Sequence, residues 1–318
     1  MTPAQIPGSD AGALATGGAA AARNAATVVI LRETAGRLEA LLLQRPATAS
    51  FAAGEWVFPG GSLEAEDCRA RSLALVHGAD ARMLSALRCE ALGARLDAEL
   101  ALGLCFAACR ETFEESGILL ARHRSGAPCS GEPLRLAQHE RLTGAHTPAT
   151  FCGLLERHDL VVASDALVYF SNWLTPLSAP RRFDARFFIT HLPPEQAVAD
   201  RLFEVEVARW LPVEDRPGGP EVEPPITAPP TLLTLRELAL LYAREGSLAR
   251  LLDAARALDP AVVMLKIVKR TGGLEALFPW DEEYAAAAGT GVPCGHALSQ
   301  RLGRFPSRIP VRVPRGAP

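Results

Sequence analysis

Three glutamates preceded by an arginine are the residues of this chain whose types and spacing are most suited to catalysis or metal binding. The segment reads Arg110-Glu111-Thr112-Phe113-Glu114-Glu115-Ser116-Gly117-Ile118. On a helix, at about 100° per residue, Glu111, Glu114 and Glu115 fall within roughly one quadrant, and the apolar side chains between 102 and 113 fall on the opposite side. Like charges this close repel each other. The pattern therefore predicts a bound cation.

The type of ligand indicates which cation this would be. All three side chains offer hard oxygens, and no cluster of histidines or cysteines lies nearby. Such a set favours Mg²⁺ or Mn²⁺ over zinc. Mg²⁺ usually shares its coordination with substrate phosphates, so the segment predicts metal-assisted attack on a phosphate or pyrophosphate. From these residues alone, a solvated acidic face on a surface helix is the alternative.

A glycine turn lies upstream of the acidic segment. The sequence from 58 to 67 is Phe-Pro-Gly-Gly-Ser-Leu-Glu-Ala-Glu-Asp, and the pair Gly60 and Gly61 permits a tight turn with close approach of the backbone to a ligand. Together the two segments resemble the box of the Nudix hydrolases. Three departures stand out: Asp67 replaces a glutamate, Thr112 replaces an apolar residue, and residues 68–109 form a spacer of 42 residues where seven are usual.

The long spacer is typical of one branch of this superfamily. The chain resembles the branch typified by a mammalian peroxisomal coenzyme A diphosphatase over about residues 26–285. Further segments carry this resemblance: Leu41-Leu42-Leu43-Gln44-Arg45, Gly54-Glu55-Trp56-Val57, Ser171-Asn172-Trp173-Leu174-Thr175-Pro176, Arg181-Arg182-Phe183-Asp184, Glu204-Val205 with Trp210, and Leu277-Phe278-Pro279 with Asp281, Glu282 and Tyr284.

The resemblance implies an α/β fold, the Nudix α/β/α sandwich with a mixed β-sheet. We expect a disordered tail at 1–24, the Nudix domain at 25–225 and a helical extension with a loosely ordered end at 226–318. The alanine- and leucine-rich insertion at about 69–103 is expected to form one or two helices outside the core, and the catalytic helix is predicted at 104–116.

The resemblance also assigns roles to residues. Glu111, Glu114 and Glu115 would hold one to three Mg²⁺ or Mn²⁺ ions, and Arg110 would orient these glutamates by a salt bridge. Glu204 matches a place where some Nudix enzymes carry an extra acid, which makes it a candidate general base. A glutamate of the box could serve instead, and Glu204 could equally be a solvated loop residue.

Two features bear on the substrate. Coenzyme A-cleaving Nudix enzymes share a pattern that fits here in spacing at Arg45, Gly54 and the glycine turn, although Pro46 and Ser50 depart from it. An ordinary strand and loop is the alternative for that segment. An arginine pair, Arg181 and Arg182, could clamp the 3′-phosphate of coenzyme A, or could be surface charge.

Composition limits the class of partner. Of the 318 residues, 48% are hydrophobic, which is ample for a core, and the net charge of −3 gives no bias towards nucleic acid. Seven scattered cysteines without a Cys-x-x-Cys pair indicate reduced thiols and a cytoplasmic protein. No signal peptide or membrane-spanning stretch is expected. By resemblance, the partner is a small nucleotide-type molecule, and a homodimer is common in the superfamily.

The leading hypothesis is therefore a metal-dependent diphosphatase that cleaves coenzyme A or acyl-CoA to 3′,5′-ADP and (acyl-)4′-phosphopantetheine. The second hypothesis is a Nudix pyrophosphatase of another nucleoside diphosphate derivative, such as ADP-ribose, NADH or a dinucleotide. The third, from a different class, is a non-catalytic Nudix-fold ligand sensor. Intact Glu111, Glu114 and Glu115 argue against the third, because a sensor does not need this cluster of charges.

Overall fold

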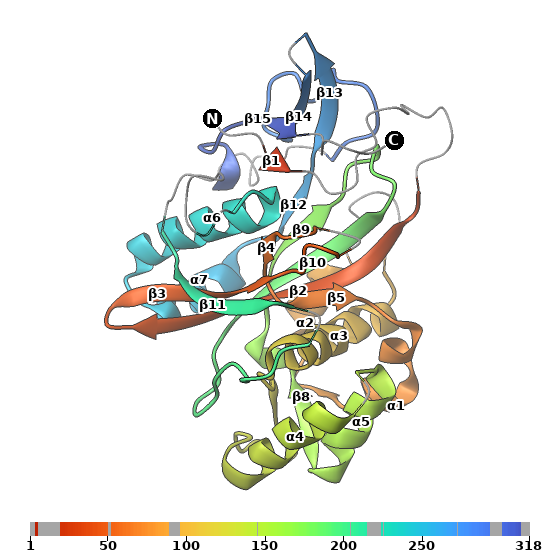
Figure 1. Cartoon of the computed structure of the whole chain (residues 1–318), viewed down its shortest axis with the longest axis vertical. Coiled ribbons are helices and arrows are strands. Elements are labelled where there is room, and N and C mark those ends of the chain that lie inside the picture. The colour runs from red at the N-terminus through yellow and green to blue at the C-terminus, as the bar shows by residue number, and fades with distance from the viewer. Residues whose placement is uncertain are drawn as a thin grey trace.

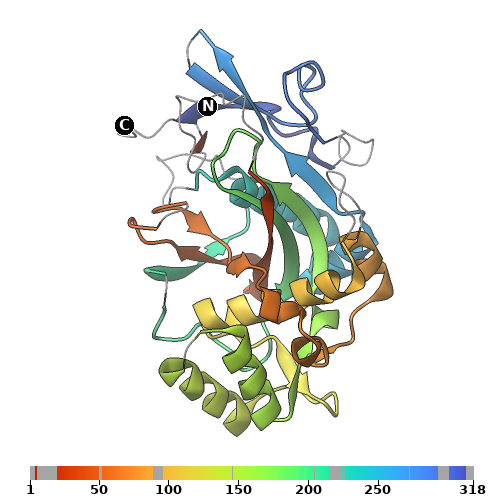
Figure 2. The same ribbon diagram turned by 90° about the vertical axis from the view of Figure 1, so that its right-hand side faces the viewer.

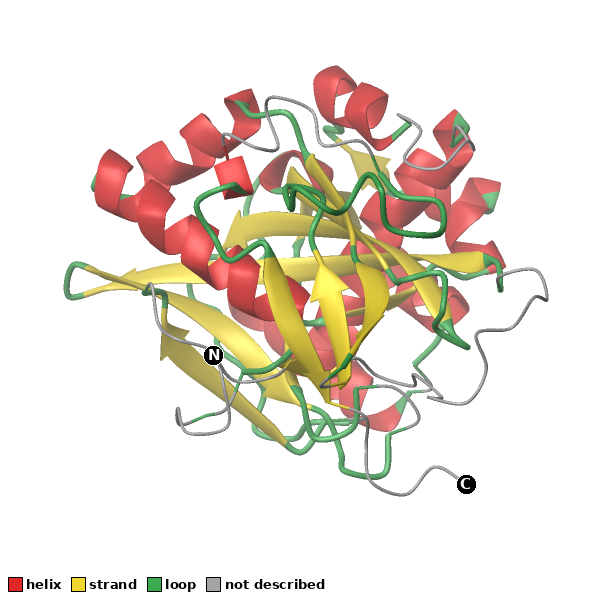
Figure 3. Ribbon diagram, turned by 90° about the horizontal axis from the view of Figure 1, so that it is seen from above, coloured by secondary structure: helices red, strands yellow, loops and turns green. Residues whose placement is uncertain are grey.

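A mixed β-sheet with helices on both faces organises the molecule (Figure 1). The computed structural model describes residues 4–5, 20–49, 52–88, 96–144, 146–203, 205–214, 224, 226–271, 273–292 and 301–312. The expected α/β sandwich is confirmed. Figure 3 shows the strands through the middle of the molecule, between helices on either side.

The central sheet has eight strands in the described residues. Its main path runs β11-β3-β2-β10-β9-β12, with β4 paired to β3 and β5 paired to β2. The pairs β2–β10 and β9–β12 are parallel and the other pairs are antiparallel. The strands are β2 (Ala22–Thr34), β3 (Arg37–Gln44), β4 (Trp56–Val57), β5 (Gly60–Ser62), β9 (Val168–Leu174), β10 (Arg182–His191), β11 (Val207–Pro212) and β12 (Ala261–Met264).

Two smaller sheets accompany it. One joins β1 (Ala4–Gln5), β15 (Arg308–Arg312), β14 (Gly273–Leu277) and β13 (Lys266–Arg270); the other joins β6 (Val76–His77), β8 (Leu160–Ala163) and β7 (Ala121–His123). The helices are η1 (Ala65–Cys68), α1 (Ala70–Leu73), α2 (Ala81–Leu87), α3 (Ala98–Ser116), α4 (Gly131–Thr143), α5 (Pro148–Arg157), η2 (Ser164–Ala166), α6 (Pro229–Glu245) and α7 (Leu248–Ala257). None of the described helices combines the length and hydropathy that crossing a bilayer requires.

Each face of the sheet has its own apolar core, because successive strand residues point to opposite faces. Val28, Ile30 and Leu41 pack with α3 and α5, whereas Val29 and Leu42 pack with α6 and α7. In Figure 2, α4 and α5 lie at one end of the molecule and the blue sheet of β13–β15 at the other. The acidic helix α3 therefore occupies one face of the sheet, with α6 and α7 covering the other.

The insertion differs from its prediction. It was expected to fold outside the core, but Leu75, Met83 and Leu87 are buried in the same apolar cluster as α3. It contains the short helices α1 and α2, the start of α3, and strand β6, which pairs with β8. Burial of these apolar side chains against α3 removes their surface from water, which lowers the free energy of the folded state. The insertion is thus part of the domain.

The segment after residue 226 contains strands in addition to the predicted helices. Helices α6 and α7 are present, but β12 joins the central sheet and β13–β15 form most of the second sheet. The β-branched residues of Ala261–Met264 and of 267–268 fit strands. Most of the tail predicted at 1–24 lies outside the described residues, and β2 begins at Ala22.

Candidate active site

Helix α3 supplies the acidic side chains and has a signal at each end. The Asp97 side chain accepts a hydrogen bond from the Leu100 amide at 2.7 Å, a usual N-cap arrangement. At the other end Gly117 adopts the left-handed conformation (φ 77°), and its amide binds the Phe113 carbonyl. The helix starts six residues before the predicted Leu104 and ends where predicted. Both its sheet-facing side and the side carrying the glutamates are largely covered.

The glycine turn reaches this helix across the long spacer. The Gly60 amide donates a hydrogen bond to Glu115 Oε2 at 2.8 Å. A Cβ added at Gly61 would overlap the carboxylate of Glu111. Gly60 itself has φ 153°, and a Cβ there would overlap the backbone at Ala26. Both positions therefore need glycine, and the turn lies directly against the acids.

Arg110 connects the two halves of the motif. Its guanidinium forms a two-bond ion pair with Asp67, with Nε–Oδ1 and Nη2–Oδ2 both at 2.9 Å. Nη1 binds Glu111 Oε1 and Glu114 Oε2, also at 2.9 Å. Arg110 is 1% exposed and Asp67 is fully buried. Burial by itself lowers the pKa of Arg110, but its three carboxylate partners raise the pKa by more than burial lowers it. The arginine therefore stays charged.

Glu114 has the most unusual environment of the three acids. Burial raises its pKa to about 7, against the lowering effect of Arg110 and with a further rise from Glu111. One carboxylate oxygen binds Arg110, while the other, Oε1, is buried without a hydrogen-bond partner. A buried polar atom without a partner is costly. Coordination of a cation would satisfy that oxygen.

The residues present thus fit a hard divalent cation. Helix α3 presents three carboxylates on one side, and carboxylate oxygens are the ligands that Mg²⁺ and Mn²⁺ prefer. One of these oxygens, Oε1 of Glu114, has no hydrogen-bond partner. In the described part of the chain, no three such side chains are already arranged to hold a metal ion. Glu111 and Glu114 turn towards Arg110, and Glu115 turns towards Gly60.

A second arginine, Arg141 of α4, fixes the end of α3. Its Nε and Nη2 donate to the carbonyls of Phe113 and Glu114 at 2.7 and 2.9 Å, and Nη1 donates to the Arg201 carbonyl at 2.9 Å. The carbonyls of Phe113 and Glu114 belong to the last turn of the helix, where acceptors lack intrahelical partners and a cation is favoured. Burial lowers the pKa of Arg141 to about 10, although Glu114 opposes this.

A first prediction concerns the turn. We expect Gly61→Ala to lower kcat by roughly 10–100-fold, because the added methyl group displaces the Glu111 carboxylate and small displacements of reacting groups are costly. Thermal unfolding and steady-state rates would be measured together. Gly36→Ala is the control for an added methyl group away from the acids: it meets nothing within 4 Å, but Gly36 has φ 73°, so we expect a lower unfolding temperature with an unchanged kcat. Equal rates for wild type and Gly61→Ala would contradict the close packing of turn and helix.

A cleft lies on the other side of the glycine turn. It has a volume of about 360 Å³ and includes Gly60, Gly61, Arg45 and Arg181 in its wall. Aromatic side chains and the start of α6 complete it; they include Phe58, Trp173, Phe183, Phe187, Pro229 and Pro230. Such a mixture of flat apolar walls and a few cations is common in ligand sites.

The two arginines predicted to act as a pair do not share this cleft. Arg181 is exposed and lines it, whereas Arg182 is 7% exposed and donates to the carbonyls of Thr175 and Ala20. Neighbours on a strand point to opposite faces. Phe183 and Ala185 face the cleft, so Arg182 faces the other way. Of the arginines predicted to bind substrate, Arg45 and Arg181 line the cleft and Arg182 does not.

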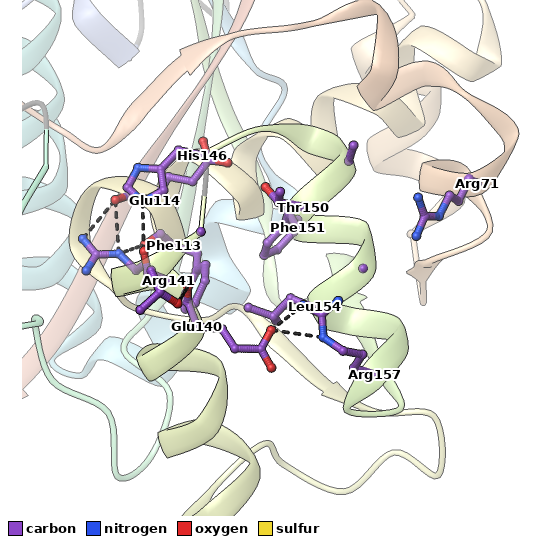
Figure 4. Close-up of a pocket in the computed structure, with 14 residues that line it drawn as sticks. Arg71, Phe113, Glu114, Glu140, Arg141, His146, Thr150, Phe151, Leu154 and Arg157 are labelled. Atoms are coloured by element: carbon purple, nitrogen blue, oxygen red, sulfur yellow. Dashed lines mark hydrogen bonds and ion pairs between the residues drawn. The ribbon is translucent and has the colours of Figure 1, made fainter.

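A second cavity, of about 410 Å³, lies beside the end of α3 (Figure 4). Glu114 and Phe113 contribute to its wall from α3, and the remaining lining comes mainly from α4, α5 and the loop between them. Neither cavity was predicted from the sequence.

Three further outcomes concern individual residues. Glu204, the candidate general base, lies outside the described residues. Sequence reasoning did not assign a role to Asp67, although its position in the box was noted as a departure from glutamate. It also missed Arg141. Nothing in the local sequence distinguishes this arginine from its neighbours, because its partners lie more than twenty residues away.

A known protein family matches the part of the chain that contains the glycine turn and α3. The model of the family described as the NUDT19 Nudix domain matches residues 13–236, which include the glycine turn and the whole of α3. The chain belongs to this NUDT19 Nudix domain family. The relatives agree: acyl-coenzyme A diphosphatase NUDT19 of Gallus gallus is 33% identical over 235 residues, which cover 59% of this chain and 60% of the chicken protein. The human protein of the same name is 30% identical over 273 residues, which cover 77% of this chain and 72% of the human protein.

The relatives are longer than the matched region. The chain spans 60% of the length of the chicken protein and 52% of its Xenopus laevis counterpart. Among solved structures, a Nudix hydrolase from Alicyclobacillus acidocaldarius superposes with a TM-score of 0.50 at 26% identity, covering 69% of this chain and 92% of that one. The Nudix fold of this NUDT19-family chain is thereby shown independently of the sequence motif.

Proposed function

We propose that this member of the NUDT19 Nudix domain family is a metal-dependent hydrolase that cleaves the pyrophosphate bond of coenzyme A or its acyl esters. The products are 3′,5′-ADP and 4′-phosphopantetheine or its acyl form. The observation that carries the proposal is the packing of the glycine turn against Glu111 and Glu115 of α3, with Arg110 between the acids and Asp67. Relatives named acyl-coenzyme A diphosphatase support the choice of substrate.

In this mechanism Glu111, Glu114 and Glu115 would hold Mg²⁺ or Mn²⁺. When bound, such a cation neutralises pyrophosphate oxygens and lowers the pKa of a coordinated water. Arg110 is a positioning residue: its bonds to Glu111 and Glu114 fix the direction of both carboxylates. The Gly60 amide does the same for Glu115. Correct placement of these groups before the substrate arrives lowers the barrier.

The proton of the attacking water needs an acceptor. Glu204 or one of the glutamates of α3 would serve as general base. Burial raises the pKa of Glu114 to about 7 in the absence of a cation, and a coordinated cation would lower it again, so this pKa does not single out Glu114 as the base. Arg45 and Arg181, in the wall of the cleft beside Gly60 and Gly61, would bind phosphate groups of the nucleotide.

Another nucleoside diphosphate derivative is the second candidate. Pro46 and Ser50 depart from the pattern of coenzyme A-cleaving enzymes, and this favours ADP-ribose, NADH or a dinucleotide. A panel of these compounds with coenzyme A and acyl-CoA, resolved by chromatography in Mg²⁺ and in Mn²⁺, would decide between them. Our proposal expects the highest kcat/KM for coenzyme A or an acyl-CoA. A higher value for ADP-ribose or NADH would replace it by the alternative.

Arg181 provides a prediction about the 3′-phosphate. We expect Arg181→Ala to raise KM for coenzyme A by about tenfold, the size of one lost charge-assisted contact, and to leave dephospho-coenzyme A unaffected. Steady-state kinetics on both substrates test this. Arg69→Ala, at an exposed arginine between η1 and α1, is the matched control. An equal loss on both substrates would show that Arg181 does not read the 3′-phosphate.

Other properties belong to the proposal as well. We expect the partner to be a small nucleotide-type molecule, neither nucleic acid nor membrane, and the protein to form a homodimer. A cytoplasmic location is supported by the free thiols of Cys68, Cys105, Cys109, Cys129 and Cys152.

A further inference from the structure

A row of side chains crosses the central sheet on the face that α3 covers. Gly61 of β5 pairs with Ala26 of β2, and Ala26 pairs with Arg186 of β10. Arg186 pairs in turn with Asn172 of β9. Paired residues point to the same face of a sheet, and a Cβ at Gly61 would meet the Glu111 carboxylate. The side chains of Arg186 and Asn172 therefore lie on the same face as the acids of α3.

The Arg186 side chain extends from β10 towards the strand of the glycine turn. Its Nη1 donates to Asn24 Oδ1 of β2 at 2.9 Å and pairs with Asp184 Oδ2 at 2.7 Å. The Asn24 carbonyl accepts a hydrogen bond from the amide of Leu63, which follows β5, at 2.9 Å. Neighbouring strands lie about 4.8 Å apart. The guanidinium thus reaches β2, one strand away from the glycine turn.

Arg186 is deeply buried, yet most of its donors are unused. It is 2% exposed, and every hydrogen bond that it makes within the described residues comes from Nη1. Its Nε is buried without a partner there. Arg110 and Arg141, which are also buried, donate from all three nitrogens. Because a buried donor without a partner is costly, the unused edge of Arg186 needs an explanation beyond the packing of the chain.

The unused edge of Arg186 has the shape that binds an oxyanion. In Arg110 the same pair of nitrogens, Nε and Nη2, holds the two carboxylate oxygens of Asp67. Arginine binds phosphate in the same two-bond manner. Asn172 is 1% exposed, lies opposite Arg186 and also has an unpartnered atom, Oδ1. Rotation of its amide would present the NH₂ group to the same anion.

The charge of the neighbouring residues favours an anion as well. Alternate residues of a strand share a face, so Arg182, Asp184 and Arg186 of β10 lie in line. The two cations outnumber the single acid, and Nη2 of Arg182 is also buried without a partner in the described part of the chain. Asn24 and Asp184 are only partly buried, so the row is not closed to a ligand at that end.

We propose that Arg186 is a catalytic residue whose Nε and Nη2 bind two oxygens of one phosphate of the substrate's pyrophosphate, with the Asn172 amide as a further donor. This inference rests on the proposed function, but only on the pyrophosphate that coenzyme A shares with ADP-ribose and NADH. Asp184 and Asn24 hold Nη1 and so fix the guanidinium before the substrate arrives. A fixed donor of this kind stabilises the charge that develops on the phosphate during attack.

The first test is Asn172→Asp, which keeps the size of the side chain. A carboxylate opposite Arg186 would pair with Nε and occupy the edge that the phosphate needs. We expect an unfolding temperature equal to or above that of wild type, and a Kd for coenzyme A, measured by calorimetry in EDTA, that rises about tenfold. In Mg²⁺, kcat/KM should fall roughly 100-fold. Adenosine 3′-phosphate, which lacks the pyrophosphate, should bind both proteins equally.

Arg186→Lys is the second variant, because lysine keeps the charge but cannot form two parallel bonds. We expect the same losses for coenzyme A and dephospho-coenzyme A, since both carry the pyrophosphate. Arg301→Lys is the matched control. Arg301 is also largely buried, and its three nitrogens donate to Glu237 and to two backbone carbonyls away from the acids. This control should lower the unfolding temperature and leave Kd and kcat/KM unchanged.

Each outcome has a separate meaning. If Asn172→Asp folds with unchanged Kd and kcat/KM, the row is structural and filled by water, so the inference fails and the proposed function stands. An equal weakening of adenosine 3′-phosphate would also overturn it. If Asn172→Asp does not fold, as judged by circular dichroism, wild-type kcat/KM in Arg186→Lys overturns the inference. If wild type cleaves ADP-ribose or NADH instead of coenzyme A, only the proposed substrate fails, and that compound replaces coenzyme A in the same tests. If it cleaves no pyrophosphate compound, both proposals fall.

Discussion

Glu114→Gln should reduce kcat by about 10²–10⁴-fold, the range for loss of a group that acts directly at the reacting centre, without unfolding the protein. The amide keeps the shape of the side chain, but it is a poor ligand for a cation and cannot accept a proton. Glu114 combines a buried oxygen without a partner and a pKa raised to about 7, and no other acid on α3 has this combination in the described residues.

The fold should tolerate this substitution. Arg110 loses one of its three acidic partners but keeps the two-bond pair with Asp67 and the bond to Glu111. Steady-state rates with coenzyme A and a thermal unfolding curve would be recorded for the same sample. Glu66→Gln serves as the control, because Glu66 is a half-exposed acid near the turn that pairs with Arg69. Full activity of Glu114→Gln would remove Glu114 from the mechanism.

Asp67→Ala should have the largest effect on stability. Removal of one partner from a buried ion pair leaves the other charge buried and costs about 3–5 kcal/mol. Arg110 is 1% exposed and Asp67 is fully buried, and two of the guanidinium nitrogens point at this carboxylate. The Asp67 side chain also accepts from the Glu64 amide at 2.8 Å, so the turn of η1 would loosen as well.

Urea unfolding at neutral pH measures this loss. Asp253→Ala is the matched control, because Asp253 also pairs with an arginine, Arg256, but is 77% exposed, and exposed pairs contribute little. We also expect Asp67→Ala to lower activity in the folded fraction, since Arg110 would no longer be held. A free energy of unfolding equal to that of wild type would show that the buried pair does not connect turn and helix.

The sequence predicted the helix that carries the three glutamates. Its helical period placed the three glutamates together, and Gly117 marked the end of α3. The contact of the turn with the acids across residues 68–109 came from resemblance, because spacing alone would not predict it. The structure explains how the contact survives the insertion: the ion pair of Arg110 with Asp67 joins residues 43 positions apart.

Features that depend on tertiary packing were not predictable in this way. Which of Arg181 and Arg182 faces the cleft depends on the register of β10 against β2 and β9, and a shift of one residue would exchange them. Arg141 finds its partners only when α4 packs against the end of α3. The insertion entered the core because Leu75 and Met83 meet apolar neighbours that are distant in sequence.

The most direct test of the central claim is the fate of coenzyme A with purified protein in excess Mg²⁺, followed by chromatography. We predict equal amounts of 3′,5′-ADP and 4′-phosphopantetheine, formed only while Mg²⁺ is available and abolished by EDTA. If coenzyme A, acyl-CoA and the other pyrophosphate compounds all remain intact in excess Mg²⁺ and Mn²⁺, the acids of α3 do not form a hydrolytic site and the account is wrong.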